Sequence, residues 1–108
     1  MTHQTVTRAQ DPDRFEIAVD DRTAGFTQFV DHDGQRIFFH TVIEDEFGGQ
    51  GLAASLVQEA LERTRADGVR IVPVCPYVAR FLPKTDEFAD IVDEPTDESR
   101  RLARRAAR

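Results

Sequence analysis

Hydrophobic and polar residues alternate along the first half of the chain with the two-residue period of half-buried strands. Every second position of residues 14–19 is apolar, and the alternation resumes over residues 23–30 after a short turn. The Asp-His-Asp-Gly sequence at 31–34 favours a tight hairpin. Residues 35–43 are apolar on both faces, as expected of a strand that is covered on two sides. The pattern predicts three consecutive strands.

A helical period replaces this alternation after a glycine-bearing stretch at residues 47–51. Apolar residues recur at helical spacing over residues 52–61, and polar residues take the opposite face. Gly68 is a natural C-terminal stop, because glycine readily adopts the left-handed conformation that ends many helices. The pattern predicts one long amphipathic helix.

A buried strand and a second, shorter helix are expected next. Residues 69–74 are mostly apolar, and Pro76 suits the first position of a helix, which places Cys75 at the N-cap. Pro83 ends that helix. The predicted order is strand, strand, strand, helix, strand, helix, followed by a polar C-terminal tail. We expect an α/β (α+β) fold with a mixed, mainly antiparallel sheet and two principal helices.

The length limits the chain to one domain, because 108 residues can bury one hydrophobic core but not two. We expect a flexible leader at 1–13, a single domain at 14–95 and an arginine-rich tail or helix at 96–108. The leader has no apolar run after a basic start and lacks the parts of a secretion signal. The lone cysteine cannot form an intramolecular disulfide, which favours a cytoplasmic location.

The net charge of -6 disfavours general nucleic-acid binding, and no apolar run approaches the roughly 20 residues that cross a bilayer. A single cysteine and three scattered histidines offer no zinc-ligand spacing, so no metal is expected. Positive charge gathers only at the C-terminus, at Arg100, Arg101, Arg104, Arg105 and Arg108. These arginines form either the solvated end of a helix or a contact for an acidic partner. The oligomeric state is not predicted.

The glycine-rich stretch lies between a strand and a helix, which is an arrangement that binds phosphate. Backbone N–H groups converge at a helix start beside the positive end of its dipole, and glycines let the chain approach an anion closely. An acidic protein can bind an anionic cofactor in this way without an excess of basic side chains.

Three motifs together resemble the GNAT N-acetyltransferases. The sequence from Gly48 to Ala53, Gly-Gly-Gln-Gly-Leu-Ala, is similar to their pyrophosphate loop of Arg or Gln, two variable residues, Gly, one variable residue, then Gly or Ala, although Gly48 stands where Arg or Gln is usual. The His40-Thr41 pair before the loop, and Cys75 followed two residues later by Tyr77, resemble a small group of stand-alone, single-domain members. The resemblance covers about residues 14–88.

This resemblance implies a GNAT-like sheet and acetyl-coenzyme A as the cofactor. It implies that backbone groups of Thr41 and Ile43 pair with the pantetheine arm, in a gap beside the third predicted strand. It implies further that backbone N–H groups of the loop bind the pyrophosphate, from Gly48, Gly49, Gln50, Gly51, Leu52 and Ala53.

Two catalytic routes follow from the same resemblance. In direct transfer, His40 is the candidate base that takes a proton from the amine, and Tyr77 is the candidate acid that protonates the departing thiolate. In the covalent route Cys75 is acetylated first, and its expected place at a helix N-terminus favours the thiolate that this requires. Each of these residues has a structural reading as well, since histidine, cysteine and tyrosine also serve as packing residues.

The function that we expect is acetyl-coenzyme A-dependent transfer to an exposed amine on a protein or a small molecule. Only a short turn at 20–22 separates the first two predicted strands, where larger acetyltransferases insert helices that wall the acceptor pocket. The acceptor site should therefore be open. The alternatives are a noncatalytic acyl-coenzyme A-binding module and an interaction protein that uses the C-terminal arginines.

Overall fold

The computed structural model describes residues 3–49 and 51–107. In these residues the chain forms five strands, three α-helices and short 3-10 turns. The strands are Gln4–Ala9 (β1), Arg14–Val19 (β2), Arg22–His32 (β3), Gln35–Ile43 (β4) and Arg70–Pro73 (β5). The helices are Leu52–Ala66 (α1), Pro76–Phe81 (α2) and Asp97–Ala106 (α3), and the 3-10 turns are Asp45–Phe47, Leu82–Lys84 and Ala89–Ile91.

The strands form one sheet in the order β1-β2-β3-β4-β5. Neighbouring strands are antiparallel except β4 and β5, which are parallel. Two hairpins join β2 to β3 and β3 to β4 through Asp20-Asp21 and Asp33-Gly34, whose φ angles are all positive. Two-residue turns of this kind match the right-handed twist of the strands they connect. The predicted mixed, mainly antiparallel sheet is confirmed.

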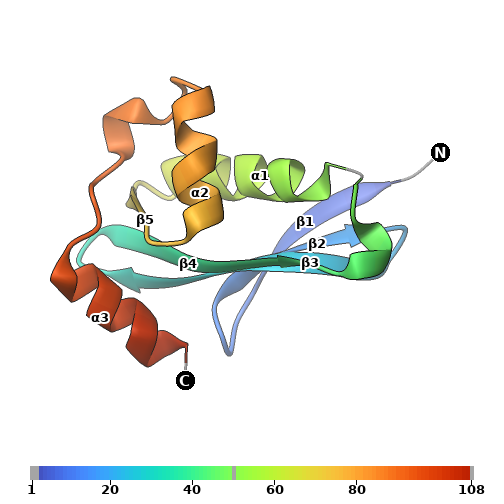
Figure 1. Cartoon of the computed structure of the whole chain (residues 1–108), viewed down its shortest axis with the longest axis horizontal. Coiled ribbons are helices and arrows are strands. Elements are labelled where there is room, and N and C mark those ends of the chain that lie inside the picture. The colour runs from blue at the N-terminus through green and yellow to red at the C-terminus, as the bar shows by residue number, and fades with distance from the viewer. Residues whose placement is uncertain (1–2, 50, 108) are drawn as a thin grey trace.

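The helices cover both faces of the sheet (Figure 1). α1 and α2 lie on one face, and α3 lies on the other. α1 buries an apolar stripe that includes Leu56 and Leu61 against the same core as Phe15 and Phe29 of the sheet. It ends as predicted, since Gly68 has a φ angle of 74° just after the helix.

The N-terminal residues are not the flexible leader that the sequence indicated. Residues 4–9 form β1, which pairs with β2 along its whole length and supplies the edge of the sheet. Only Val6 and Ala9 are partly buried, so the strand depends on pairing with β2 rather than on an apolar pattern of its own. Arg63 of α1 reinforces the strand by donating a hydrogen bond to the carbonyl of Val6 at 2.5 Å.

The C-terminal residues form a third helix that packs on the sheet, where we had expected two principal helices and a tail or helix. α3 begins with a capping box, in which Thr96 and Ser99 exchange side-chain to backbone hydrogen bonds of 3.0 and 2.7 Å. Its residue Ala103 is buried in a small cluster with Ile37 and Val72. Among the helices in the described ranges, none is long and apolar enough to cross a membrane.

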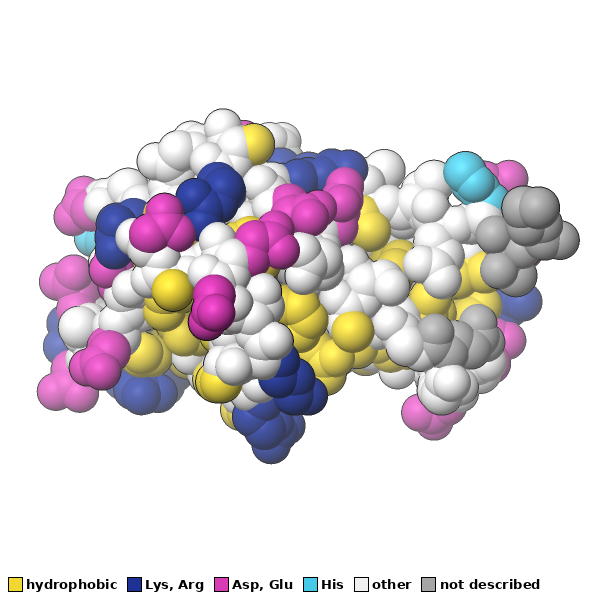
Figure 2. All heavy atoms as spheres, turned by 90° about the horizontal axis from the view of Figure 1, so that it is seen from above, with side chains coloured by type: hydrophobic (Ala, Val, Ile, Leu, Met, Phe, Trp, Pro, Cys, Tyr) yellow, Lys and Arg dark blue, Asp and Glu magenta, His cyan; other side chains and the backbone are white. Residues whose placement is uncertain are grey.

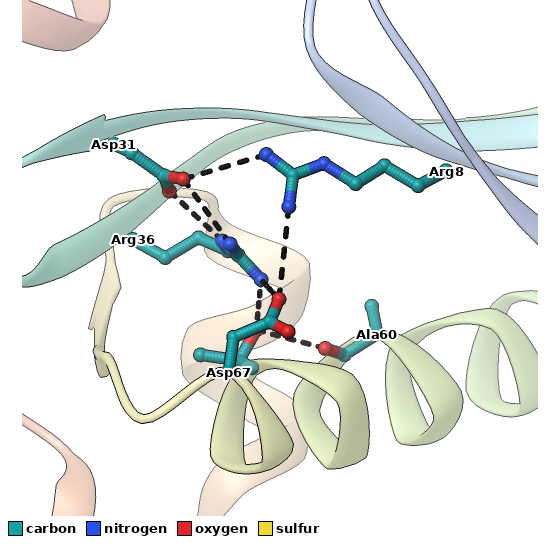
Figure 3. Close-up of polar contacts among 6 residues, drawn as sticks. Arg8, Asp31, Arg36, Ala60 and Asp67 are labelled. Carbon is teal, nitrogen blue, oxygen red and sulfur yellow. Dashed lines mark hydrogen bonds and ion pairs between the residues drawn. The ribbon is translucent and has the colours of Figure 1, made fainter.

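A buried arginine joins α1 to the sheet (Figure 3). Arg36 of β4 is 2% exposed and donates to Asp31 of β3 at 2.8 Å and to Asp67, just after α1, at 2.9 Å. Burial opposes its charge, but the hydrogen bonds and the attraction of both carboxylates outweigh burial and raise the pKa of Arg36. Arg8 of β1 pairs with the same two carboxylates at 3.5 and 3.6 Å. The network fixes the end of α1 over β1, β3 and β4.

Candidate functional site

The strands β4 and β5 separate in the middle of the molecule. Their pairing ends at Phe38 and Pro73, after which the backbone N–H of Cys75 still donates to the carbonyl of Phe38 at 2.7 Å. β4 continues to Ile43 with β3 as its partner on one side only. No other strand in the described part of the chain pairs with the opposite edge of this segment. The predicted cofactor residues Thr41 and Ile43 both lie on this open edge.

A bulge in β4 decides which way the candidate residues point. Gln28 of β3 pairs with His40 and the next residue, Phe29, pairs with Phe38, so Phe39 is an extra residue in β4. Phe38 belongs to the core beneath α1, whereas Phe39 packs in the cluster beneath α3. The extra residue reverses the alternation that follows.

His40 therefore lies on the α3 face of the sheet, although it is two residues from Phe38. Its ring contacts Phe26, with the ring centroids 5.7 Å apart. Phe26 and Val30 are four residues apart in β3, so their side chains lie on the same face of the sheet. Val30 packs beneath α3, which identifies this face as the one that α3 covers. The imidazole is solvent-exposed on that face.

Cys75 lies on the other face, at the predicted N-cap of α2. Its thiol is 3.3 Å from the hydroxyl of Thr41, which is 2.9 Å from the hydroxyl of Thr27. Cys75 is only 3% exposed, and it packs against the core beneath α1. The structure thus separates the two candidate catalytic residues, with the sheet between their side chains.

The glycine-rich loop contains two residues in the left-handed backbone conformation. Gly49 and Gly51 have φ angles of 80° and 72°, which residues with a side chain rarely adopt. Gly51 is the N-cap of α1, and no side chain among the described residues caps the helix. The first turn also holds no acidic residue that could compete for its backbone N–H groups. These groups are therefore free to donate hydrogen bonds to a ligand beside the positive end of the helix dipole. Gln50 lies outside the described residues.

This loop opens into a pocket of about 170 Å³ that extends to α2. Most of the predicted cofactor residues meet here, because the pocket is lined by Ile43, Phe47, Gly48, Gly49, Gly51, Leu52, Ala53, Ala54 and Tyr77. No charged side chain is part of this lining. Figure 2 views the face that carries α1 and α2, and hydrophobic side chains are visible along the middle of that face. Thr41 does not line the pocket, and its hydroxyl contacts the thiol of Cys75 instead.

Two basic residues extend the site beyond what the sequence analysis named. Tyr77 also lines a second pocket of about 360 Å³ together with Arg80, Phe81 and Lys84. Arg80 and Lys84 are four residues apart at the end of α2 and the turn after it, and neither forms an ion pair with a described residue. Their helical spacing from Tyr77 was a usable signal in the sequence, because residues three and four apart share one side of a helix.

The separation of β4 and β5 beside an uncapped helix that starts after Gly51 is the arrangement that the sequence resemblance to GNAT N-acetyltransferases implied. The comparison with protein families agrees, since residues 14–91 match the family model described as GCN5-related N-acetyl-transferase. The chain belongs to this family, whose members are N-acetyltransferases that generally use acetyl-coenzyme A. No match was found among curated proteins.

Two solved structures share the fold. A GCN5-like protein from Staphylococcus aureus, solved by NMR, has a TM-score of 0.65 and 22% identity over 90% of this chain and 95% of its own. The ribosomal-protein-S18-alanine N-acetyltransferase from Escherichia coli has a TM-score of 0.58 and 12% identity, covering 64% of each chain. At these identities the likeness establishes the GNAT fold that the sequence motifs indicated.

Proposed function

We propose that the chain transfers an acetyl group from acetyl-coenzyme A to an amine. The observation that carries this proposal is the continuity between the open edge of β4 and the pocket at the start of α1. A long thin molecule with a diphosphate would find backbone pairing at one end of this path and free N–H groups at the other. Family membership makes acetyl-coenzyme A the molecule of that shape to test first.

The residues present fit this cofactor. Backbone groups of Thr41 and Ile43 would hold the pantetheine arm, since that stretch of β4 has lost its β5 neighbour. The N–H groups from Gly48 to Ala53, with Gln50 among the residues that the structure does not describe, would bind the diphosphate. Gly48 supplies no side chain at this position, and we assign the missing positive charge to Arg80 and Lys84 across the pocket wall that Tyr77 forms.

The bound coenzyme supplies an acetyl group activated as a thioester. His40 would take one proton from the acceptor ammonium, so that the nitrogen lone pair is free to form the new C–N bond. Tyr77 would donate a proton to the sulfur as the C–S bond breaks and recover one from the nitrogen. One proton thus reaches solvent through His40, and one ends on the thiol.

The direct route is favoured over acetylation of Cys75 by the surroundings of the two groups. A nucleophilic thiol must reach the thioester carbon, yet Cys75 is 3% exposed and engaged with the hydroxyl of Thr41. The imidazole of His40 is exposed on the face from which an acceptor can approach without passing the coenzyme. We therefore give His40 the role of base and Cys75 a place in the wall of the site.

Binding and turnover should be tested separately. Calorimetry with acetyl-coenzyme A is expected to show one site, and ¹⁵N NMR shifts should concentrate at Gly48, Gly49, Gly51 and Ala53. Ala53→Glu, which puts a carboxylate in the first turn, should abolish binding, whereas Glu62→Ala at an exposed position of the same helix should not. Shifts spread evenly over the surface, with equal binding by both variants, would refute the site.

Thiol release with a panel of amines then separates an enzyme from a binding module. An enzyme should release coenzyme A in proportion to added amine and yield an acetylated product detectable by mass spectrometry. Binding without amine-dependent release would leave the noncatalytic module as the function.

A further inference from the structure

A pocket of about 270 Å³ lies on the α3 face of the sheet, away from the glycine-rich loop. It is lined by Phe39, Val74, Arg100, Ala103, Arg104 and Ala107. Phe39 of β4 and Val74, just after β5, form an apolar floor, and Arg100 and Arg104 of α3 line another wall. α3 lies beyond the residues that match the family model, so this wall is an addition of the chain's C-terminal part.

The position of this pocket relates it to the reaction centre. Phe39 and Val74 directly precede His40 and Cys75, and consecutive Cα atoms are about 3.8 Å apart. His40 shares the α3 face with the pocket, whereas the coenzyme pocket opens on the α1 face. The gap in which β4 and β5 separate lies between the two.

The two arginines of this pocket differ from all the arginines that precede α2. Each arginine up to residue 70 forms an ion pair with a carboxylate, namely Arg8, Arg14, Arg22, Arg36, Arg63, Arg65 and Arg70. The side chains of Arg100 and Arg104 form neither an ion pair nor a hydrogen bond with any residue that the structure describes. Being four residues apart, they lie side by side on α3. Two unpaired cations beside an apolar floor complement an anion with an apolar body.

We propose that this pocket binds the acceptor, and that Arg100 and Arg104 select amines that carry a carboxylate or a phosphonate-like group on an apolar scaffold. The proposal rests on the proposed function, whose acceptor it specifies. Phe39 and Val74 would contact the scaffold, and the amine would point to His40. The volume is slightly below that of drug-sized ligand sites, which favours a small molecule over a folded protein surface.

Matched amines can test this selection. Benzylamine, 4-(aminomethyl)benzoate and 4-(aminomethyl)phenylphosphonate share one scaffold and differ only in the anionic group. Wild-type protein should use the better anionic amine with a kcat/KM about tenfold above that of benzylamine, as expected for a charge-assisted hydrogen bond. Comparison of the two anionic amines identifies which group the site prefers.

In the double variant R100Q/R104Q, the ratio of kcat/KM for the better anionic amine to kcat/KM for benzylamine should fall from about ten to about one. The control is R101Q/R105Q, which removes the same charge from α3 at positions that do not line the pocket. No preference in the wild type, or an equal loss in both double variants, overturns the proposal, because either result means a diffuse electrostatic effect or none.

A binding measurement without coenzyme keeps the result separate from that of the proposed function. On titration with 4-(aminomethyl)benzoate, ¹⁵N NMR shifts should appear at Phe39, Val74 and Ala103 and be absent in R100Q/R104Q. If these shifts appear while acetyl-coenzyme A does not bind, the proposed function fails and the anion pocket stands. If coenzyme binds and turns over but these amides do not shift with the anionic amine, the acceptor proposal fails alone.

Discussion

The thiol of Cys75 and the hydroxyl of Thr41 lie 3.3 Å apart, although the two residues are 34 positions apart in sequence. The contact bridges β4 and the start of α2 just where β5 ends. It places a polar but almost fully buried group beside the open edge that we assign to the coenzyme. The role of Cys75 can be tested with a variant that lacks its sulfur atom.

Cys75→Ala should keep acetyl transfer within about tenfold of wild type, because the direct route needs no thiolate. Wild-type protein, incubated with acetyl-coenzyme A without an amine, should show no acetyl group on Cys75 by mass spectrometry. An acetylated Cys75 that disappears on adding an amine, with activity lost in the alanine variant, would establish the covalent route instead.

His40→Gln should lower kcat by about 100-fold or more, the usual contribution of a general base. Coenzyme affinity should be unchanged, since His40 lies on the other face from the coenzyme pocket. Added imidazole should restore part of the rate by supplying the missing base in solution. A variant with full activity would remove His40 from the mechanism.

The sequence predicted the parts of this site whose signals are local. Gly68 ends α1, the Asp33-Gly34 turn joins β3 to β4, and Pro76 places Cys75 at the helix start, each through its own backbone preference. The face on which His40 lies could not be predicted this way. It depends on the bulge at Phe39, which only the pairing with β3 creates.

β1 and the docking of α3 escaped prediction for a related reason. Residues 4–9 carry too little apolar surface to signal a strand, and they become one by pairing with the edge of β2. α3 was expected as a tail or a helix, but its contact with Ile37 comes from Ala103, a small residue in an arginine-rich stretch. The pocket that we propose for the acceptor has this helix as one of its walls, which the short turn at 20–22 gave no reason to expect.

Gly25→Ala should destabilise the protein by about 1–3 kcal/mol, the usual range for forcing extra volume into packed structure. A Cβ on Gly25 would lie 2.3 Å from the carbonyl oxygen of Val42 and 2.6 Å from the side chain of Ile43. Ile43 lines the coenzyme pocket, so its displacement should also weaken coenzyme binding. Thermal unfolding and calorimetry measure both effects. Gly34→Ala is the control, because a Cβ at Gly34 would contact no other atom within 4 Å. Its only cost is the strain of a side chain at a φ angle of 76°.

Arg36→Ala should destabilise the fold by about 3–5 kcal/mol, because it removes a buried cation from two carboxylates and leaves a cavity. The guanidinium also lies over the Phe29 ring, 4.7 Å from its centroid, and that contact is lost as well. Arg8→Ala removes the more exposed arginine from the same two carboxylates and should cost about 1 kcal/mol or less. Equal losses in urea unfolding would show that burial of Arg36 adds nothing.

Asp93 should make the free energy of unfolding fall as the pH is lowered into the acid range. A hydrogen bond from Gln35 and, against some burial, contacts with Arg70 lower the pKa of Asp93 in the folded protein. The folded state therefore favours the ionised carboxylate, and this contribution is present above the ordinary carboxyl pKa and is lost as pH falls through the lowered value. Asp93→Asn should be less stable than wild type by about 1 kcal/mol at pH 7. The difference in the free energy of unfolding between the two proteins, measured in urea, should shrink as the pH falls from roughly 5 to 2. Asp93 of the wild type becomes protonated over this range and loses its charge. A difference that stays constant over this range would show that the variant loses packing and not charge.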